Sequence, residues 1–270
     1  MNANQTDPFG RRVDYLRISV TDRCNLRCIY CMPEEGIRLL RHEDILSFDE
    51  IRDFTEVAVA EGVTKVRITG GEPLVRKGIT TLVRMISDIN GIEDLSMTTN
   101  GVLLKNFASD LRSSGLHRVN ISLDTIDPQK FTMITRNGNI VDVLEGIKAA
   151  TNAGLLPVKI NCVVKESKEE EEAKAVTRFC KDNNLEIRYI KQMDLVNGHF
   201  SMVDGGTGGD CSLCNRLRLT ANGKLKPCLF NNIEFDIREL GFEKAIKLAI
   251  ELKPECGSKN STGTFYNIGG

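Results

Sequence analysis

The stretch DYLRISVTDRCNLRCIYC, residues 14–31, joins a short β-like run to three closely spaced cysteines. Within Tyr15–Val20, apolar side chains alternate with Arg17 and Ser19, which is typical of a strand with one apolar and one polar face. Soft sulfur ligands favour zinc or iron–sulfur clusters. The stretch therefore predicts a strand whose following loop carries a metal centre, with the ligands Cys24, Cys28 and Cys31.

Further β-like runs follow this first strand and alternate with amphipathic, helix-like segments. The runs are Lys65–Thr69, Leu95–Asn100, Val119–Asp124, Val158–Val164 and Glu186–Lys191. One helix is expected to open at a capping box, Ser47 to Glu50, and others at about Ile79–Ile89, Asn106–Ser114, Val141–Ala153 and Ser167–Asp182. This α/β pattern of about six repeats predicts a parallel sheet curled into a partial, open (β/α) barrel over residues 1–193.

The polar faces of these strands indicate what the barrel contains. Strands buried on both faces are continuously apolar, whereas several runs here alternate. If helices cover the apolar faces, the polar faces line a lumen that includes Arg17, Lys65, Arg67 and Lys159. Such a lumen suits a large anionic ligand. Alternatively, some of these residues lie at strand ends in solvent.

The pattern changes after Met193. Residues 194–210 are irregular and Gly-rich, which indicates a connection. A hairpin with an Asn-Gly turn is expected over Arg216–Thr220 and Lys224–Pro227, followed by a helix at about Phe242–Leu252. A second cysteine group accompanies the hairpin. Residues 194–270 are therefore predicted to form a small C-terminal domain that binds a second metal centre through Cys211, Cys214 and Cys228.

Composition excludes several classes of protein. The 270 residues include 36 Lys and Arg against 37 Asp and Glu, so a broadly basic nucleic-acid-binding surface is excluded. No run approaches the roughly 20 apolar residues of a membrane span, and the start shows no secretory signal. An odd count of nine cysteines favours metal or catalytic use over disulfides. We expect a cytoplasmic protein with no nucleic-acid or membrane partner.

Three cysteines stand apart from the two groups. Cys162 and Cys180 share apolar faces with their neighbours and are predicted to be buried core thiols. Cys256 precedes Gly257 and is expected in a plain turn. The alternative for Cys256 is a fourth ligand to the second metal centre.

The first cysteine group, Cys-x3-Cys-x2-Cys after a first strand with Tyr30 before the last cysteine, resembles the radical S-adenosylmethionine (SAM) enzymes. Gly70-Gly71-Glu72-Pro73 after the second strand resembles their SAM-binding loop. The second group, with Cys214-Asn-Arg216-Leu-Arg218 and the terminal Gly269-Gly270, is similar to the GTP 3′,8-cyclases of molybdenum-cofactor biosynthesis. The resemblance begins at Asp14 and has one large gap, because that family has a longer segment where 194–210 stands here. Lys191 also occupies a position where an acidic residue is expected.

The resemblance implies a specific chemistry. Cys24, Cys28 and Cys31 would hold a [4Fe–4S] cluster whose open iron chelates SAM, and Cys211, Cys214 and Cys228 a second one whose open iron meets the purine. One electron would cleave SAM to methionine and a 5′-deoxyadenosyl radical. That radical would remove the 3′ hydrogen of GTP, and the ribose radical would add to C8 of guanine. The product would be (8S)-3′,8-cyclo-7,8-dihydroguanosine 5′-triphosphate.

The resemblance also assigns individual residues and partners. SAM-binding positions are Tyr30, Gly71, Glu72, Ser122 and Met193. GTP-binding positions are Arg17, Lys65, Arg67, Thr98, Lys159, Arg216 and Arg218. Catalytic roles fall to Arg17, Arg216, Arg218, Gly269 and Gly270. Implied partners are GTP, an electron donor such as flavodoxin or ferredoxin, a downstream cyclic pyranopterin monophosphate synthase and a second copy of the chain in a homodimer.

Two other functions stay open at this point. The same radical chemistry acting on another nucleotide, a peptide or a tetrapyrrole is favoured by the short 194–210 segment. Arg216, Arg218 and the Gly-Gly tail favour GTP instead. A non-catalytic iron–sulfur or zinc protein is the alternative of another class, and SAM cleavage distinguishes it from an enzyme.

Overall fold

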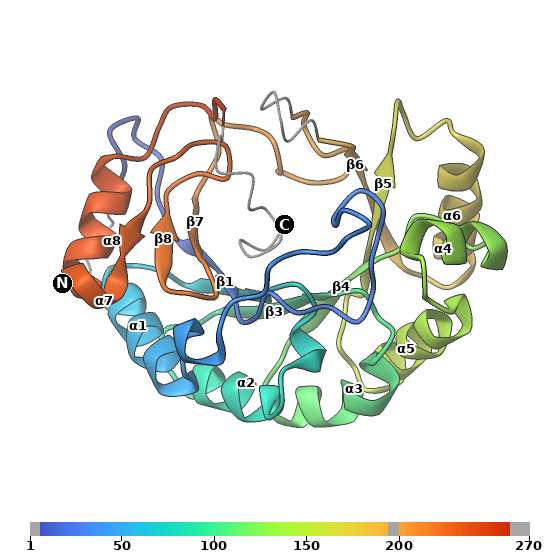
Figure 1. Cartoon of the computed structure of the whole chain (residues 1–270), viewed down its shortest axis with the longest axis horizontal. Helices are drawn as coiled ribbons and strands as arrows, with labels where there is room; N and C mark the ends of the chain where they lie inside the picture. Colours follow the sequence, from blue (N-terminus) through green and yellow to red (C-terminus); the bar gives the residue numbers. More distant parts are fainter. Residues whose placement is uncertain (1–5, 194–199, 260–270) are drawn as a thin grey trace.

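The computed structural model describes residues 6–193 and 200–259, and within them one curved sheet holds all the strands (Figure 1). The strand order is β6-β5-β4-β3-β2-β1-β7-β8-β9. Neighbouring strands from β6 to β7 are parallel, and β8 and β9 are antiparallel additions. The strands are β1 (Tyr15–Ser19), β2 (Lys65–Thr69), β3 (Asp94–Thr99), β4 (Arg118–Ser122), β5 (Lys159–Val164), β6 (Glu186–Lys191), β7 (Arg216–Leu219), β8 (Lys224–Lys226) and β9 (Phe235–Asp236).

Helices cover the outer, convex face of the sheet in Figure 1. The capping box predicted at Ser47 is present: its hydroxyl accepts from Glu50 N, and Glu50 Oε2 accepts from Ser47 N. The α-helices are α1 (Phe48–Ala60), α2 (Ile79–Ser87), α3 (Leu104–Ser113), α4 (Pro128–Thr135), α5 (Ile140–Asn152), α6 (Glu171–Asp182), α7 (Ile237–Leu240) and α8 (Phe242–Glu251). Short 3₁₀ turns occur at η1 (His42–Asp44) and η2 (Pro73–Val75).

The main core lies between these helices and the sheet. Apolar residues of the alternating strands, such as Leu16, Ile18 and Val66, are fully buried there. Cys162 and Cys180 belong to the same core, as predicted. The polar residues of the same strands consequently face the concave side.

The barrel is open, as predicted. In the described part of the chain β6 and β9 are the two edges of the sheet, and β7 pairs with β1 on the side away from β6. The hairpin of β7 and β8 thus extends the barrel sheet itself. The division into domains 1–193 and 194–270 stays a prediction, although strands from both parts share one sheet.

Some elements differ from the sequence-based expectation. Helix α6 begins at Glu171 rather than at Ser167. Helix α4 was not expected, although its start carries ordinary signals: Asp127 caps the backbone N–H groups of Gln129 and Lys130, and Pro128 occupies the first turn. The Asn-Gly turn is confirmed by Gly223, whose φ of +82° lies in the left-handed region that glycine tolerates.

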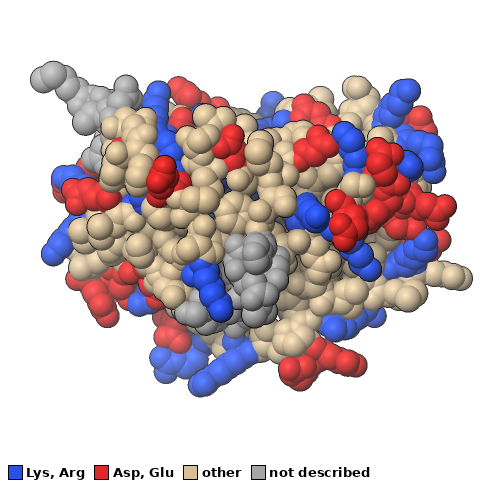
Figure 2. Space-filling model, turned by 90° about the horizontal axis from the view of Figure 1, so that it is seen from above, with Lys and Arg blue, Asp and Glu red and all other residues tan. Residues whose placement is uncertain are grey.

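The surface carries charges of both signs. On the face shown in Figure 2, Lys and Arg side chains are interspersed with Asp and Glu. Among the described helices, none combines the length and the apolar character needed to cross a membrane.

Candidate active site

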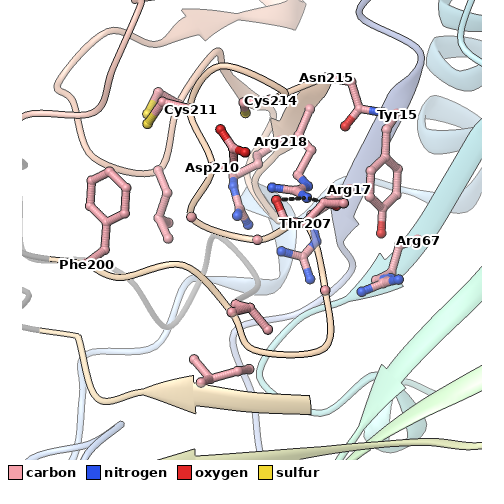
Figure 3. A pocket seen from close by; sticks show the side chains of 18 of the residues that line it. Tyr15, Arg17, Arg67, Phe200, Thr207, Asp210, Cys211, Cys214, Asn215 and Arg218 are labelled. Atoms are coloured by element: carbon pink, nitrogen blue, oxygen red, sulfur yellow. Dashed lines mark hydrogen bonds between the residues drawn. The ribbon is translucent and has the colours of Figure 1, made fainter. Parts of the chain in front are cut away.

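A cavity of about 380 Å³ lies on the concave side of the sheet (Figure 3). Side chains from β1, β2, β6 and β7 line it, together with residues from the loop that precedes β7. Of the residues predicted for the lumen, Arg17, Lys65 and Arg67 line this cavity, and so do Arg216 and Arg218 of the hairpin. The cavity therefore collects the cationic side chains that the sequence suggested for an anionic ligand.

Strand register places three of these arginines in one row. Arg17 pairs with Arg67 across β1 and β2, and with Arg218 across β1 and β7. Because residues in register on parallel strands point to the same face, the three guanidinium groups are neighbours in the cavity. Two residues earlier on β1 and on the same face, Tyr15 lies in register with Lys65 and Arg216.

The ring of Tyr15 contacts an arginine of each row. The guanidinium carbons of Arg67 and Arg216 lie 5.4 and 5.9 Å from the centroid of its ring. A cation over an aromatic face is attracted by the ring's electrons, so Tyr15 helps to hold both arginines. Nothing in the sequence pattern marked Tyr15 as a site residue, although it shares the alternating face of Arg17.

The electrostatics of the row favour an anionic ligand. Burial lowers the pKa of Arg17 well below its ordinary value, and Arg218 lowers it further. Burial and the neighbouring Arg216 lower the pKa of Arg218 to about 10. The Nε atoms of Arg17 and Arg188 are buried and have no hydrogen-bond partner among the described residues. A bound polyanion would supply the missing acceptors and the opposite charge.

Two predicted GTP-binding residues lie outside the set that lines the cavity. Lys159 on β5 forms an ion pair with Glu186, with Nζ 2.5 Å from Oε2. Thr98 on β3 has a buried hydroxyl without a hydrogen-bond partner in the described structure. Lys65 lines the cavity but also pairs with Asp14 at 2.9 Å. Lys65 and Lys159 thus differ from Arg17 and Arg67 in that their ammonium groups already form ion pairs with carboxylates.

The first cysteine group lies in the long loop between β1 and α1, at the carboxyl end of β1. Backbone hydrogen bonds from Arg27 to Thr135 and from Ile29 to Ile134 attach this loop to α4. Burial raises the pKa of Cys28 to about 12, and Cys31 and Cys24 add to the effect, so the three thiols lie close together. Coordination to metal deprotonates thiols outright and reverses this penalty. A set of three sulfurs with no oxygen or nitrogen ligand fits an iron–sulfur cluster.

The glycines after β2 allow the loop to approach closely. A Cβ on Gly71 would lie only 2.4 Å from the carbonyl oxygen of Arg23, so no other residue fits without displacing the backbone. Gly71 N also donates to Thr21 O at 2.7 Å. The Gly-Gly turn therefore packs directly against the segment that leads into the first cysteine group.

Glu72, one of the predicted SAM-binding residues, is buried against the end of β3. Its side chain is fully buried, and its carboxylate accepts from Thr99 Oγ1 at 2.8 Å and from Asn100 N at 2.6 Å. Burial raises the pKa of Glu72 to about 7. Asn100 in turn donates to Asn25 Oδ1 at 2.8 Å and to Cys24 Sγ at 3.7 Å. Glu72 thus fixes the end of β3 through hydrogen bonds. Asn100, which follows β3, is in turn hydrogen-bonded to the loop that carries the first cysteine group.

Tyr30 is fixed by a carboxylate at the end of β4. Its hydroxyl donates to Asp124 Oδ2 at 2.6 Å, while Asp124 Oδ1 accepts from Val163 N at 2.8 Å. Burial raises the pKa of Asp124. Ser122, two residues before Asp124, ends β4 at this edge, and Met193 follows β6 and lines the cavity. Gly269 and Gly270 lie outside the described residues.

The second cysteine group, Cys211, Cys214 and Cys228, lines the cavity beside the arginine row. Burial acts to raise the pKa of Cys214, but the Lys253 ammonium and other nearby donors outweigh it, so the pKa is lowered. Among the described residues, no three His, Cys, Asp or Glu side chains surround one point as the ligands of a single metal ion would. A four-iron cluster places each thiolate on a different iron, and this sulfur-only set fits that group.

The loop before β7 contributes residues that sequence reasoning missed. Arg216 Nη2 donates to both the carbonyl oxygen and the hydroxyl of Thr207, each at 3.1 Å. Asp204 forms a backbone bridge with Tyr189 of β6, which attaches the loop to the barrel edge. The Gly-rich composition of this loop carries no periodicity that could have placed Thr207. Arg188, by contrast, could have been found from its position on the predicted β6 run.

Comparisons with protein families agree with this geometry. The family model described as the radical SAM superfamily matches residues 18–180. The model described as Molybdenum Cofactor Synthesis C matches residues 164–259. The first match spans the barrel from β1 to α6, and the second includes the hairpin and the second cysteine group.

Curated relatives cover most of the chain. A GTP 3′,8-cyclase of Thermodesulfovibrio yellowstonii is 43% identical over 309 aligned positions, which cover 94% of this chain and 96% of the relative. The GTP 3′,8-cyclase of Moorella thermoacetica is 42% identical, with 86% of each chain covered. Because 309 positions exceed the 270 residues of this chain, the first relative has residues without a counterpart here.

Solved structures share the fold at low sequence identity. Streptococcus suis SuiB bound to S-adenosylmethionine superimposes with a TM-score of 0.66 at 16% identity, covering 96% of this chain and 71% of that one. Native anSMEcpe with bound AdoMet gives a TM-score of 0.59 at 15% identity, covering 88% and 84%. With its cysteine loop after β1, its second cysteine group beside the arginine row and relatives above 40% identity, this chain belongs to the radical SAM superfamily and, within it, to the family of the GTP 3′,8-cyclases.

Proposed function

We propose that this protein is a radical SAM lyase that converts GTP to (8S)-3′,8-cyclo-7,8-dihydroguanosine 5′-triphosphate in molybdenum-cofactor biosynthesis. The observation that carries the proposal is the row formed by Arg218, Arg17 and Arg67 in a cavity lined by the second cysteine group. The names of the relatives, which are GTP 3′,8-cyclases, support the same substrate.

The arginine row suits a triphosphate. A guanidinium group offers a planar fork of donors that matches phosphate oxygens, and it stays charged even when buried. Arg17, Arg67 and Arg218 would bind the phosphates, and Arg216, held by Thr207, would orient the nucleoside end. Lys65, Thr98 and Lys159 complete the proposed GTP-binding set, and Gly269 and Gly270 the proposed catalytic set.

The first cysteine group would be the place where the 5′-deoxyadenosyl radical is formed. Cys24, Cys28 and Cys31 would hold a [4Fe–4S] cluster, which when bound supplies the electron that splits SAM. Tyr30, Gly71, Ser122 and Met193 would bind SAM, with Glu72 shaping the loop from behind. The hydrogen bonds of Glu72 and Asp124 hold these loops in place around the proposed SAM site.

The cellular setting follows from this chemistry. We infer a cytoplasmic enzyme that takes its electron from flavodoxin or ferredoxin and passes its product to a cyclic pyranopterin monophosphate synthase. A homodimer is part of the same proposal. Each of these is tested by binding measurements with the purified partner.

The decisive experiment is product analysis under strictly anaerobic conditions. Reconstituted, reduced protein is mixed with SAM and GTP, and 5′-deoxyadenosine and the cyclised nucleotide are measured by mass spectrometry. Deuterium at the 3′ position of GTP should appear in 5′-deoxyadenosine. SAM cleavage without a GTP-derived product would rule out GTP as the substrate. Absence of SAM cleavage would rule out a radical SAM activity of this protein.

A second substrate class has one observation in its favour. Only 19 residues, 192–210, lie between β6 and the second cysteine group, and the relative from T. yellowstonii has residues with no counterpart in this chain. A shorter wall could admit a different nucleotide, a peptide or a tetrapyrrole. Competition against GTP in the product assay, with ATP, CTP and a small peptide as competitors, separates these possibilities.

A further inference from the structure

The hydroxyl of Tyr15 is a buried polar group at the cavity that has no hydrogen-bond partner among the described residues. Such a group is costly in the free energy of folding, because it has given up its hydrogen bonds to water. Tyr15 also lies outside the GTP-binding set that the family resemblance assigns. The packing of its ring against two arginines accounts for the ring but not for the hydroxyl.

Strand β1 places this hydroxyl beside the arginine row. Tyr15 comes two residues before Arg17, so both side chains point to the concave face. The guanidinium carbons of Arg67 and Arg216 lie 5.4 and 5.9 Å from the centroid of the Tyr15 ring. Figure 3 shows the hydroxyl end of the ring directed toward Arg67 and away from Asn215. The phenol thus reaches the part of the cavity where the cationic groups gather.

The surroundings of the phenol oxygen are cationic. Burial lowers the pKa of four guanidinium groups, and the neighbouring Tyr15 opposes this change in all of them: Arg17, Arg67, Arg188 and Arg218. The phenol therefore lies within electrostatic range of the whole group. Its oxygen lone pairs are attracted by these cations, so the O–H hydrogen is best directed away from them, toward an acceptor in the cavity.

Carboxylates around this part of the cavity are engaged by other donors. Asp94 accepts from Arg118 Nε at 3.1 Å. Asp14 accepts from Lys65 Nζ at 2.9 Å and, through its other oxygen, from Asn215 Nδ2 at 2.6 Å. Neither carboxylate accepts from the phenol. A phosphate oxygen is the acceptor that a site with this concentration of positive charge selects.

We propose that Tyr15 is a GTP-binding residue whose hydroxyl donates a hydrogen bond to an oxygen of the triphosphate. A neutral donor adds a contact to the anion without adding to the repulsion among the arginines. The hydrogen bond also shifts electron density into the ring, which strengthens the attraction of the ring for Arg67 and Arg216. The inference rests on the proposed function in taking GTP as the substrate, and it adds a specificity-determining residue for the phosphate chain.

The test uses Tyr15→Phe in the full-length, reconstituted protein, because phenylalanine keeps the ring and removes only the hydroxyl. Anaerobic calorimetry measures the binding of GTP and of inorganic triphosphate. Both should bind roughly tenfold more weakly, as expected for the loss of one hydrogen bond to a charged group. Tyr189→Phe is the matched control and should leave both affinities unchanged, because the Tyr189 hydroxyl contacts Thr177 at 2.6 Å and Tyr189 does not line the cavity.

A double-mutant cycle separates a direct contact from an effect that acts through Arg67. If the hydroxyl touches the triphosphate, Tyr15→Phe should weaken the binding of inorganic triphosphate by a similar factor in the parent and in an Arg67→Ala background. If the hydroxyl only positions Arg67, its removal should have no effect once Arg67 is absent. That result would overturn the direct contact.

Two further outcomes would overturn the inference. One is an equal GTP affinity of the parent and Tyr15→Phe. The other is a weakening that is seen with GTP but not with inorganic triphosphate, which would place the hydroxyl on the nucleoside. Failure of the proposed function is distinguishable, because a protein that binds inorganic triphosphate through Tyr15 and forms no cyclised product would keep the phosphate contact and lose only the assigned reaction.

Discussion

Arg218 of β7 lies in register with Arg17 of β1, although about three quarters of the 270-residue chain separates them in sequence. The two buried guanidinium groups are unfavourable neighbours, and each has a lowered pKa in which burial is the largest cause. The surrounding sheet holds these like charges together, and a bound anion relieves the repulsion between them. This concentration of positive charge favours the binding of an anion.

The arginine row should dominate GTP affinity. Replacing Arg17 by Ala removes a charge-assisted contact, which is expected to weaken GTP binding by roughly ten- to a hundredfold. Lys159→Ala should have a smaller effect, because Lys159 is already paired with Glu186. Calorimetric titration of GTP into reconstituted protein measures both. Arg52→Ala on the outer helix α1 is the matched control, and an unchanged affinity in Arg17→Ala would argue for a different substrate.

Metal content should reflect two separate clusters. Anaerobically reconstituted protein is expected to contain about eight iron and eight sulfide per chain. Replacing Cys24, Cys28 and Cys31 together by Ala should remove half of each and abolish SAM cleavage, since only that group lies at the carboxyl end of β1. Colorimetric iron and sulfide analysis checks the count. Stoichiometric zinc without sulfide would contradict the assignment of both groups.

Arg216 should depend on its contact with Thr207. The hydroxyl and the carbonyl of Thr207 both accept from Arg216 at 3.1 Å, and Thr207→Val keeps the shape while removing the hydroxyl. Loss of one hydrogen bond of about 1 kcal/mol predicts an increase of about fivefold in KM for GTP, with the clusters unchanged. Thr207→Ser retains the hydroxyl and should behave as the parent. Equal KM values for the Val and Ser variants would show that the contact does not position Arg216.

Glu72 should make stability depend on pH. Its pKa is raised by burial to about 7 in the folded protein, above the usual 4.5. A carboxyl group with a raised folded-state pKa binds more protons when folded, so its contribution to stability is lost as pH rises from about 4.5 to about 7. Relative to Glu72→Gln, the parent should lose about 1–3 kcal/mol over this interval. Anaerobic urea unfolding at several pH values measures the difference, and a constant difference would show that Glu72 is ionised throughout.

Local features of the chain were readable from the sequence alone. Alternation with a period of two placed Arg17 and Arg67 on the concave face, because successive side chains of any strand point to opposite sides. The capping box at Ser47, the Asn-Gly turn and the burial of Cys162 and Cys180 likewise depend on residues close in sequence. The spacing of the cysteines indicated metal sites, and the family resemblance identified them as iron–sulfur clusters.

Contacts between distant segments were decided only by the tertiary structure. No local pattern encodes the pairing of β7 with β1 that sets Arg218 beside Arg17, because that register depends on how the whole sheet assembles. The same holds for Glu72, whose burial against Thr99 follows from the packing of the loop after β2 against the end of β3, and for Cys256, which Arg11 and Lys253 hold against Cys211. Spacing along the chain determined which residues can bind metal or phosphate, and long-range packing determined which of them meet.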